Sequence, residues 1–220
     1  MKRRYFGVCL LLVAAALAGT LFAWDHLPAR VPLHWNTDGR VDGYGPRWML
    51  LAAGPGAMLA ELAIFAALPA LSPKRFALES FTRTYLRIML AAVALAGYIT
   101  AVLLWAALTG DADVTGALLA GVSVLIVVLG NVMGKVRRNF FIGIRTPWTL
   151  ASERVWYATH RLAGKSMVAA GILSLGAVFV GGVAGIAAWI AMVLAGVMVP
   201  VVYSFVHYRT LEREGTLEAS

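Results

Sequence analysis

The chain contains a series of apolar runs about 20 residues long or longer, and these runs constrain its fold more than any other feature. A helix of about 20 residues crosses the roughly 30 Å hydrocarbon core of a bilayer. The sequence is 60% hydrophobic and 14% charged, whereas soluble domains carry roughly 25% charged residues. Its mean hydropathy is +0.78. The sequence therefore predicts an all-α, polytopic membrane protein.

Turn-forming and charged residues divide the apolar sequence into six predicted spans. The first run could be a secretory signal, but it is longer than the usual apolar region of about 7–15 residues. Gly181 and Gly182 divide the last apolar stretch, which is too long for one crossing. The predicted spans cover residues 5–24, 47–71, 85–108, 114–134, about 166–180 and about 184–207.

Basic residues are concentrated on the segments that lie on one side of these spans. If both termini, residues 72–87 and residues 134–165 share one surface, that surface carries 16 of the 19 Lys and Arg. Cytoplasmic loops carry an excess of Lys and Arg, so the pattern predicts a multi-pass protein with both termini in the cytoplasm. The net charge of +8 then indicates anionic lipid headgroups as partners and no direct nucleic-acid binding.

The longest polar interruption, which we call the motif loop, covers residues 135–165. It carries seven basic residues and a single acid, Glu153. A segment of this charge cannot lie in hydrocarbon and must lie at a membrane surface. We expect that surface to be the cytoplasmic one.

A short juxtamembrane helix is predicted within the motif loop, between spans four and five. Pro147 disfavours helix at Thr146 and therefore begins a new element. Thr149 is the expected N-cap, and Gly164 suits the position after the last turn. We therefore expect a helix over about residues 150–163.

Two interpretations of this helix remain open. Glu153, Trp156 and His160 are spaced to share one helix face. The helix could rest on the membrane with its basic residues held by lipid phosphates. Alternatively, Arg145, Glu153 and His160 could form a cytoplasmic site for a partner protein or for chemistry.

The segment over residues 25–46 is polar and rich in proline and glycine, which predicts an outer loop built from turns. Oxygen donors at Asn36, Asp38 and Asp42 superficially suggest a Ca²⁺ site. The Asp-x-Asp-x-Asp-Gly spacing and the glutamate at the twelfth position of calcium loops are missing. We therefore favour an ordered connector whose Asn and Asp side chains cap their own turns.

Glu61 lies near the middle of the second predicted span, where an acid costs about 2.5–3.5 kcal/mol on insertion scales. We expect it to be buried among helices. It could be a neutral group hydrogen-bonded to a neighbouring helix or a residue of a functional site.

The sequence offers little support for catalysis, and we predict that the protein is not an enzyme. Neither HExxH, GxSxG nor a phosphate-binding loop occurs. The lone cysteine, Cys9, and the scattered histidines lack zinc-site spacing, so no metal and no cofactor are predicted. Transport has thin support, because Glu61 is the single acid within a predicted span.

Two separate motifs resemble the SdpI family of bacterial membrane proteins, named for the immunity protein against the sporulation-delaying peptide toxin. The first motif comprises Gly130, Asn131, Asn139, Gly143, Ile144, Arg145, Thr146, Pro147, Trp148, Thr149, Glu153, Trp156 and His160. The second is similar to a companion N-terminal module of this family and comprises Pro32, His34, Trp35, Asn36, Asp38, Gly39, Asp42 and Gly43.

The resemblance implies an inner-membrane protein with two modules, over residues 1–71 and 72–220. It implies protection against a membrane-active peptide toxin. It also implies signalling, in which a cytoplasmic repressor is held at the membrane once toxin is sensed. The alternative is a small membrane transporter or a membrane-embedded enzyme of unknown substrate on the same six spans.

Overall fold

The structure is a computed structural model that describes residues 1–73, 78–110 and 114–217. Lys74 and Arg75, two of the 16 basic residues assigned to one surface, lie outside the described residues. The principal elements are α1 Lys2–Ala23, β1 Arg30–Trp35, β2 Val41–Pro46, α2 Met49–Leu51, α3 Ala57–Leu71, α4 Thr82–Thr109, α5 Thr115–Met133, α6 Pro147–Ala151, α7 Glu153–Val178 and α8 Gly182–Arg213.

Six helical stretches within the described residues are long and apolar enough to cross a membrane. The prediction of a helical, polytopic fold with a short juxtamembrane helix, α6, between two spans is therefore confirmed. The six stretches are Lys2–His26, Met49–Leu71, Leu78–Thr109, Thr115–Met133, Glu153–Val178 and Gly182–Arg213.

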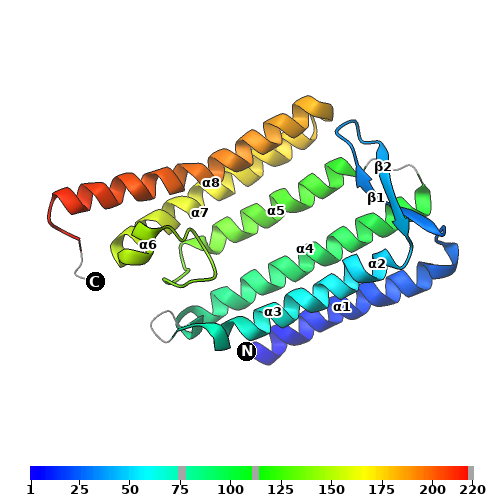
Figure 1. Cartoon of the computed structure of the whole chain (residues 1–220), viewed down its shortest axis with the longest axis horizontal. Coiled ribbons are helices and arrows are strands. Elements are labelled where there is room, and N and C mark those ends of the chain that lie inside the picture. The colour runs from blue at the N-terminus through cyan, green and yellow to red at the C-terminus, as the bar shows by residue number, and fades with distance from the viewer. Residues whose placement is uncertain (74–77, 111–113, 218–220) are drawn as a thin grey trace.

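The long helices lie side by side, with the polar segments at their two ends (Figure 1). The start of α1, the end of α8 and the short helix α6 lie at one end of the molecule. The hairpin of β1 and β2 lies at the other. We call these the motif end and the hairpin end. This arrangement brings the start of α1 and the end of α8 to the same end as the motif loop.

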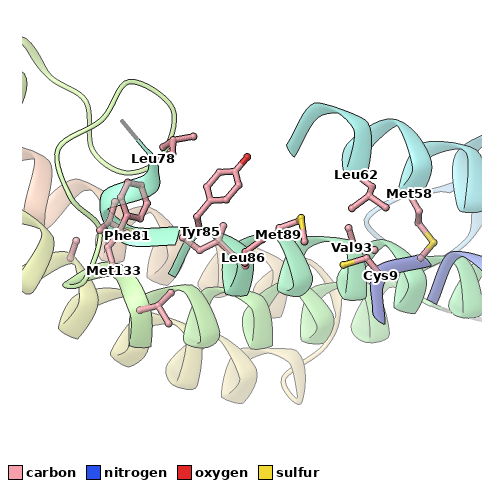
Figure 2. Close-up of a cluster of buried hydrophobic side chains, with 14 of the residues drawn as sticks. Cys9, Met58, Leu62, Leu78, Phe81, Tyr85, Leu86, Met89, Val93 and Met133 are labelled. Carbon is pink, nitrogen blue, oxygen red and sulfur yellow. The ribbon is translucent and has the colours of Figure 1, made fainter. Parts of the chain in front are cut away.

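Helices α1, α3 and α4 share one part of the buried core. Cys9 of α1, Met58 and Leu62 of α3, and Met89 and Val93 of α4 belong to one buried cluster. Figure 2 shows these side chains gathered from three different helices. Their packing joins the first span to the second and third.

Helices α5, α7 and α8 form a second tightly packed group. A Cβ on Gly171 of α7 would lie 2.9 Å from the carbonyl oxygen of Ser123 on α5, so the two backbones meet directly. The Ser123 hydroxyl accepts hydrogen bonds from Ser174 of α7 (2.9 Å) and from the indole of Trp189 on α8 (2.8 Å). Small residues and inter-helix hydrogen bonds of this kind hold membrane helices together.

The predicted boundary between the motif loop and span five is wrong. Helix α7 runs without a break from Glu153 to Val178, through Gly164. A Cβ on Gly164 would lie 2.9 Å from the carbonyl oxygen of Gly130 on α5. Gly164 is therefore a contact point between helices and does not end a helix. The predicted division at Gly181 and Gly182 is confirmed, because α7 ends at Val178 and α8 begins at Gly182.

The outer loop contains regular structure that the sequence analysis did not predict. Strands β1 and β2 pair antiparallel, with irregular register around His34. Gly39 (φ +76°) lies in the connecting turn. Alternation of apolar and polar residues is weak here because proline and glycine occupy several strand positions, which obscures the usual strand pattern.

Candidate functional site

The motif loop folds around Asn139, whose side chain is fully buried. Its amide nitrogen donates to the carbonyl oxygens of Arg137 (2.8 Å) and Ile142 (3.0 Å). Its amide oxygen accepts from the backbone N–H groups of Phe141 (2.8 Å) and Ile142 (2.7 Å). These four bonds use the full capacity of an asparagine side chain. Asn139 therefore determines the backbone path of residues 137–142.

His160 and Trp156 form the buried base on which this loop rests. Both are fully buried, and their rings stack at 4.0 Å between centroids. His160 Nδ1 lies 2.8 Å from the carbonyl oxygen of Trp156, which can only accept, so Nδ1 carries the proton. Nε2 then accepts from the backbone N–H of Ile144 at 3.0 Å. The imidazole is therefore a neutral ring with both nitrogens used.

Two further contacts complete the packing of this base. The Trp156 indole donates to the carbonyl oxygen of Val136 at 2.8 Å, which ties α7 to the start of the loop. Gly143 has φ +107°, and a Cβ at this position would collide with the His160 ring. The position therefore requires glycine for its backbone conformation and for the close approach.

The turn into α6 corrects the predicted N-cap. Thr146, with extended backbone, is the N-cap of α6, and its hydroxyl accepts from the Thr149 N–H at 3.3 Å. The Thr149 hydroxyl accepts from the Thr146 N–H at 2.9 Å and donates to the carbonyl oxygen of Ile144 at 2.8 Å. Pro147 occupies the first helical position, where no N–H is needed. Thr149 is thus the reciprocal partner in a capping box and not the cap itself.

A second cap separates the predicted single helix into two. Ser152 has extended backbone and accepts from the Val155 N–H at 3.3 Å, so it is the N-cap of α7. Helix α6 therefore ends at Ala151. Nothing in the local pattern distinguishes Ser152 from a polar residue inside a helix, so the sequence does not predict this cap.

Arg138 closes the C-terminal end of α6. Its guanidinium donates to the carbonyl oxygens of Leu150 (3.1 Å) and Ala151 (3.4 Å) and lies 3.6 Å from the Glu153 carboxylate. The Arg138 side chain is 13% exposed and that of Glu153 is 54% exposed. A cation at this end satisfies carbonyl groups that the helix leaves unpaired. Arg138 is a residue of the site that the sequence analysis did not single out.

Trp148 connects the motif loop to α8. Its indole N–H donates to the hydroxyl of Ser204, and its ring packs edge-on against Phe205 at 5.2 Å between centroids. Ser204 is fully buried. The loop is therefore attached to the last helix as well as to α5 and α7. Because 56 residues separate Trp148 from Ser204, no local spacing could have predicted this pair.

The exposed groups of the site are predominantly basic. Arg145 is exposed, and its guanidinium donates to the carbonyl oxygen of Phe140. Arg154, Arg161 and Lys165 are also exposed, on α7. The buried residues of the motif thus form a rigid support, and a basic surface lies around it. Since both His160 nitrogens are used and the ring is buried, His160 is not accessible as a general base.

The remaining predicted residues lie apart from this support. Asn131 is exposed near the end of α5. Glu61 lies on α3, beside the buried Met58 and Leu62. It is half-buried, whereas burial among helices was expected. No hydrogen bond or ion pair of Glu61 is found among the described residues.

The residues predicted in the outer loop bond mainly to one another. His34 Nδ1 contacts the Asp42 carboxylate across the hairpin. The Asn36 side chain accepts from the backbone N–H groups of Asp38 and Arg40, both at 3.0 Å. Pro32 is buried, whereas Asp38 is exposed. Within the part of the chain that the structure describes, no group of three or more His, Cys, Asp or Glu residues could hold a metal ion. These contacts are those of a connector that caps its own turn.

Comparison with known proteins gives matches that include the second motif and the part of the first motif from Asn139 onward. Residues 135–204 match the SdpI/YfhL protein family, and residues 10–59 match a domain of unknown function, DUF1648. The chain is 34% identical over 91 residues to the immunity protein SdpI of Bacillus subtilis (strain 168). That match covers 41% of this chain and 44% of the relative, so it spans less than half the relative's length. No solved structure matches the chain. The chain thus combines an N-terminal DUF1648 domain with an SdpI/YfhL family domain, and it is a distant homologue of the immunity protein SdpI.

Proposed function

We propose that this protein protects a bacterial cell against a membrane-active peptide toxin and acts without catalysis, from the cytoplasmic membrane. One observation carries the proposal. The family match over residues 135–204 includes the motif loop, α7 and most of α8, and these are the segments that Asn139, Trp156, His160 and Trp148 lock together. A peptide that inserts into the membrane would meet α7 and α8, and the rigid loop would pass a change in their packing to the exposed basic surface.

The proposed signalling role belongs to that basic surface. Arg145, Arg154, Arg161 and Lys165 project from a support that is independently held, so they can bind an acidic partner without unfolding the loop. A cytoplasmic repressor held at the membrane is the partner that the family resemblance suggests. A neighbouring gene for a small toxin precursor or for an ArsR-like repressor would support this role.

The experiment measures survival of a deletion strain that expresses variants at matched membrane abundance, under challenge with the sporulation-delaying peptide toxin. We expect Arg145→Lys to lose protection, because a point charge cannot reproduce the planar contacts of a guanidinium. His160→Ala should also lose protection, through loss of the support. Wild-type survival of Arg145→Lys, Glu153→Gln and His160→Ala together would remove this surface as the working site.

Glu61 is the observation that favours the alternative, a small membrane transporter. An ionisable group at mid-span that is half-buried indicates a functional site by default. Glu61→Gln keeps the shape of the side chain and removes its ionisation. Under the immunity proposal this variant protects like the wild type. Loss of function with normal abundance would favour transport.

A further inference from the structure

An apolar groove of about 790 Å³ lies between helices α4 and α5, in the half of the molecule nearer the motif end. Leu90, Ala91 and Ala94 line it from α4, and Val124, Leu125 and Val128 line it from α5. The groove lies between the two tightly packed helix groups, α1, α3 and α4 on one side and α5, α7 and α8 on the other.

Tyr98 closes the groove at its inner end. Its hydroxyl donates to the carbonyl oxygen of Ala117 on α5 at 2.9 Å, which joins the two helices at this level. A Cβ on Gly121 would lie 2.5 Å from the nearest atom of the Tyr98 ring, so α5 is in close contact with the ring. The groove therefore does not continue as an open path across the membrane.

The depth of the groove matches one leaflet of a bilayer. Its lining on α4 extends from Arg87 to Tyr98, which is about 16 Å at 1.5 Å per residue. One leaflet contributes roughly half of the 30 Å hydrocarbon core, about 15 Å. A membrane-spanning peptide helix would need a path twice as deep. The chain of a lipid from one leaflet fits the length.

The mouth of the groove is polar and basic. Arg87, Asn131 and Tyr5 line it, from α4, α5 and α1 respectively. Arg87 and Asn131 are both exposed, and neither has a hydrogen bond or ion pair to another of the described residues. A cation, an amide and a phenol that converge above an apolar slot offer donors to an anionic oxygen group at headgroup depth.

We propose that this groove binds one anionic phospholipid of the leaflet at the motif end, with its phosphate at Arg87 and Asn131 and an acyl chain between α4 and α5. The proposal does not depend on the immunity function. It makes the lipid a structural partner that joins the two helix groups.

The test uses the full chain, purified and stripped of lipid in detergent, and native mass spectrometry with added lipid. The probes are phosphatidylglycerol and phosphatidylcholine with identical acyl chains. We expect the wild type to retain one phosphatidylglycerol in preference to phosphatidylcholine. Arg87→Gln should weaken this binding roughly fivefold, as expected for one basic residue at a headgroup. Arg83→Gln, on the same helix and exposed outside the groove, should leave binding unchanged.

A second pair of variants tests the acyl-chain slot. Ala94 is exposed to the groove, so Ala94→Trp should fill the slot without entering the core and should abolish lipid retention. Ala101→Trp, on an exposed position of α4 outside the groove, is the matched control. Equal retention of the two lipids, or unchanged binding in both Arg87→Gln and Ala94→Trp, would overturn the proposal. So would an Ala94→Trp protein that keeps its lipid but loses protection against the peptide toxin, because the groove would then hold the peptide.

Discussion

At the scale of single residues, several members of the motif serve the fold directly. Asn139, Thr149, Trp156 and His160 are fully buried, and their polar atoms are paired within the loop or with α7. A buried polar group is costly unless it is hydrogen-bonded, so each of these residues specifies one loop conformation. The chemistry accessible at the surface of the motif end then belongs to their exposed neighbours.

Asn139→Asp should destabilise the loop by about 2–3 kcal/mol. The carboxyl can still accept from Phe141 and Ile142, but it lacks the two donors and places negative charge beside two carbonyl oxygens. The measurement is the thermal unfolding midpoint in detergent, together with protease cleavage within residues 135–146. Arg154→Gln, on the exposed face of α7, is the control and should behave like the wild type. An unchanged midpoint and cleavage rate for Asn139→Asp would contradict the assigned role.

Neighbouring residues Thr159 and His160 should respond in opposite ways. Thr159 Oγ1 is buried, and no hydrogen-bond partner is found for it within the described part of the chain. Thr159→Val removes this group at nearly constant volume and should leave stability unchanged or raise it by up to about 1 kcal/mol. His160→Ala should lower stability by about 3 kcal/mol, through a cavity and an unpaired Ile144 N–H. Chemical denaturation of both variants provides the comparison, and equal loss in both would refute it.

At the scale of elements, the interface of α5 and α7 depends on glycine. Gly130, Gly164 and Gly171 lie where a Cβ would meet the backbone of the facing helix. Lipid is as apolar as the helices, so close backbone approach and hydrogen bonds through Ser123 supply the association. The same proximity explains why α7 continues through Gly164.

Gly171→Ala and Gly176→Ala make the same change on the same helix and should differ in outcome. At Gly171 the new methyl group would lie 2.9 Å from the carbonyl oxygen of Ser123, and overpacking should cost about 1–3 kcal/mol. At Gly176 nothing lies within 4 Å of the new Cβ, and alanine should stabilise the helix slightly. Unfolding by denaturant in micelles distinguishes the two. A loss of stability at both positions would point to helix flexibility and away from packing.

At the scale of the whole molecule, the two ends differ in charge as the sequence predicts. The start of α1, the end of α8 and the motif loop share one end, and the hairpin lies at the other (Figure 1). That the motif end faces the cytoplasm remains a prediction from the distribution of Lys and Arg.

Cysteine labelling tests this orientation. The chain has one cysteine, so Cys9→Ala gives a background free of thiols. Asp38→Cys in the hairpin should react with a maleimide that cannot cross the membrane in intact spheroplasts. Glu214→Cys, which follows α8, should react after lysis alone. The reverse pattern would invert the topology and place the basic surface outside the cell.

The sequence by itself determined the number of spans and the family resemblance, and it predicted a surface position for the motif loop. The free energy of transferring a helix into a bilayer depends on the hydropathy and charge of its own residues. A window of about 20 residues is therefore enough to predict a span or a surface segment. The sequence did not predict the two strands of the outer hairpin, because proline and glycine obscure their strand pattern. The sequence also did not predict that one expected helix is divided into α6 and α7. Ser152 acts as the N-cap of α7 because its backbone is extended in the folded structure.

The tertiary structure alone decided which polar residues are support and which are surface. The backbone N–H of Ile144 donates to the buried His160 ring, and the Trp148 indole donates to the hydroxyl of Ser204 on α8. Tyr98 of α4 bonds to Ala117 of α5, and the groove lies between these two helices on the side of Tyr98 nearer the motif end. Each of these contacts joins residues far apart in the chain. Such pairings depend on the packing of whole helices, which no local pattern of hydropathy or spacing encodes.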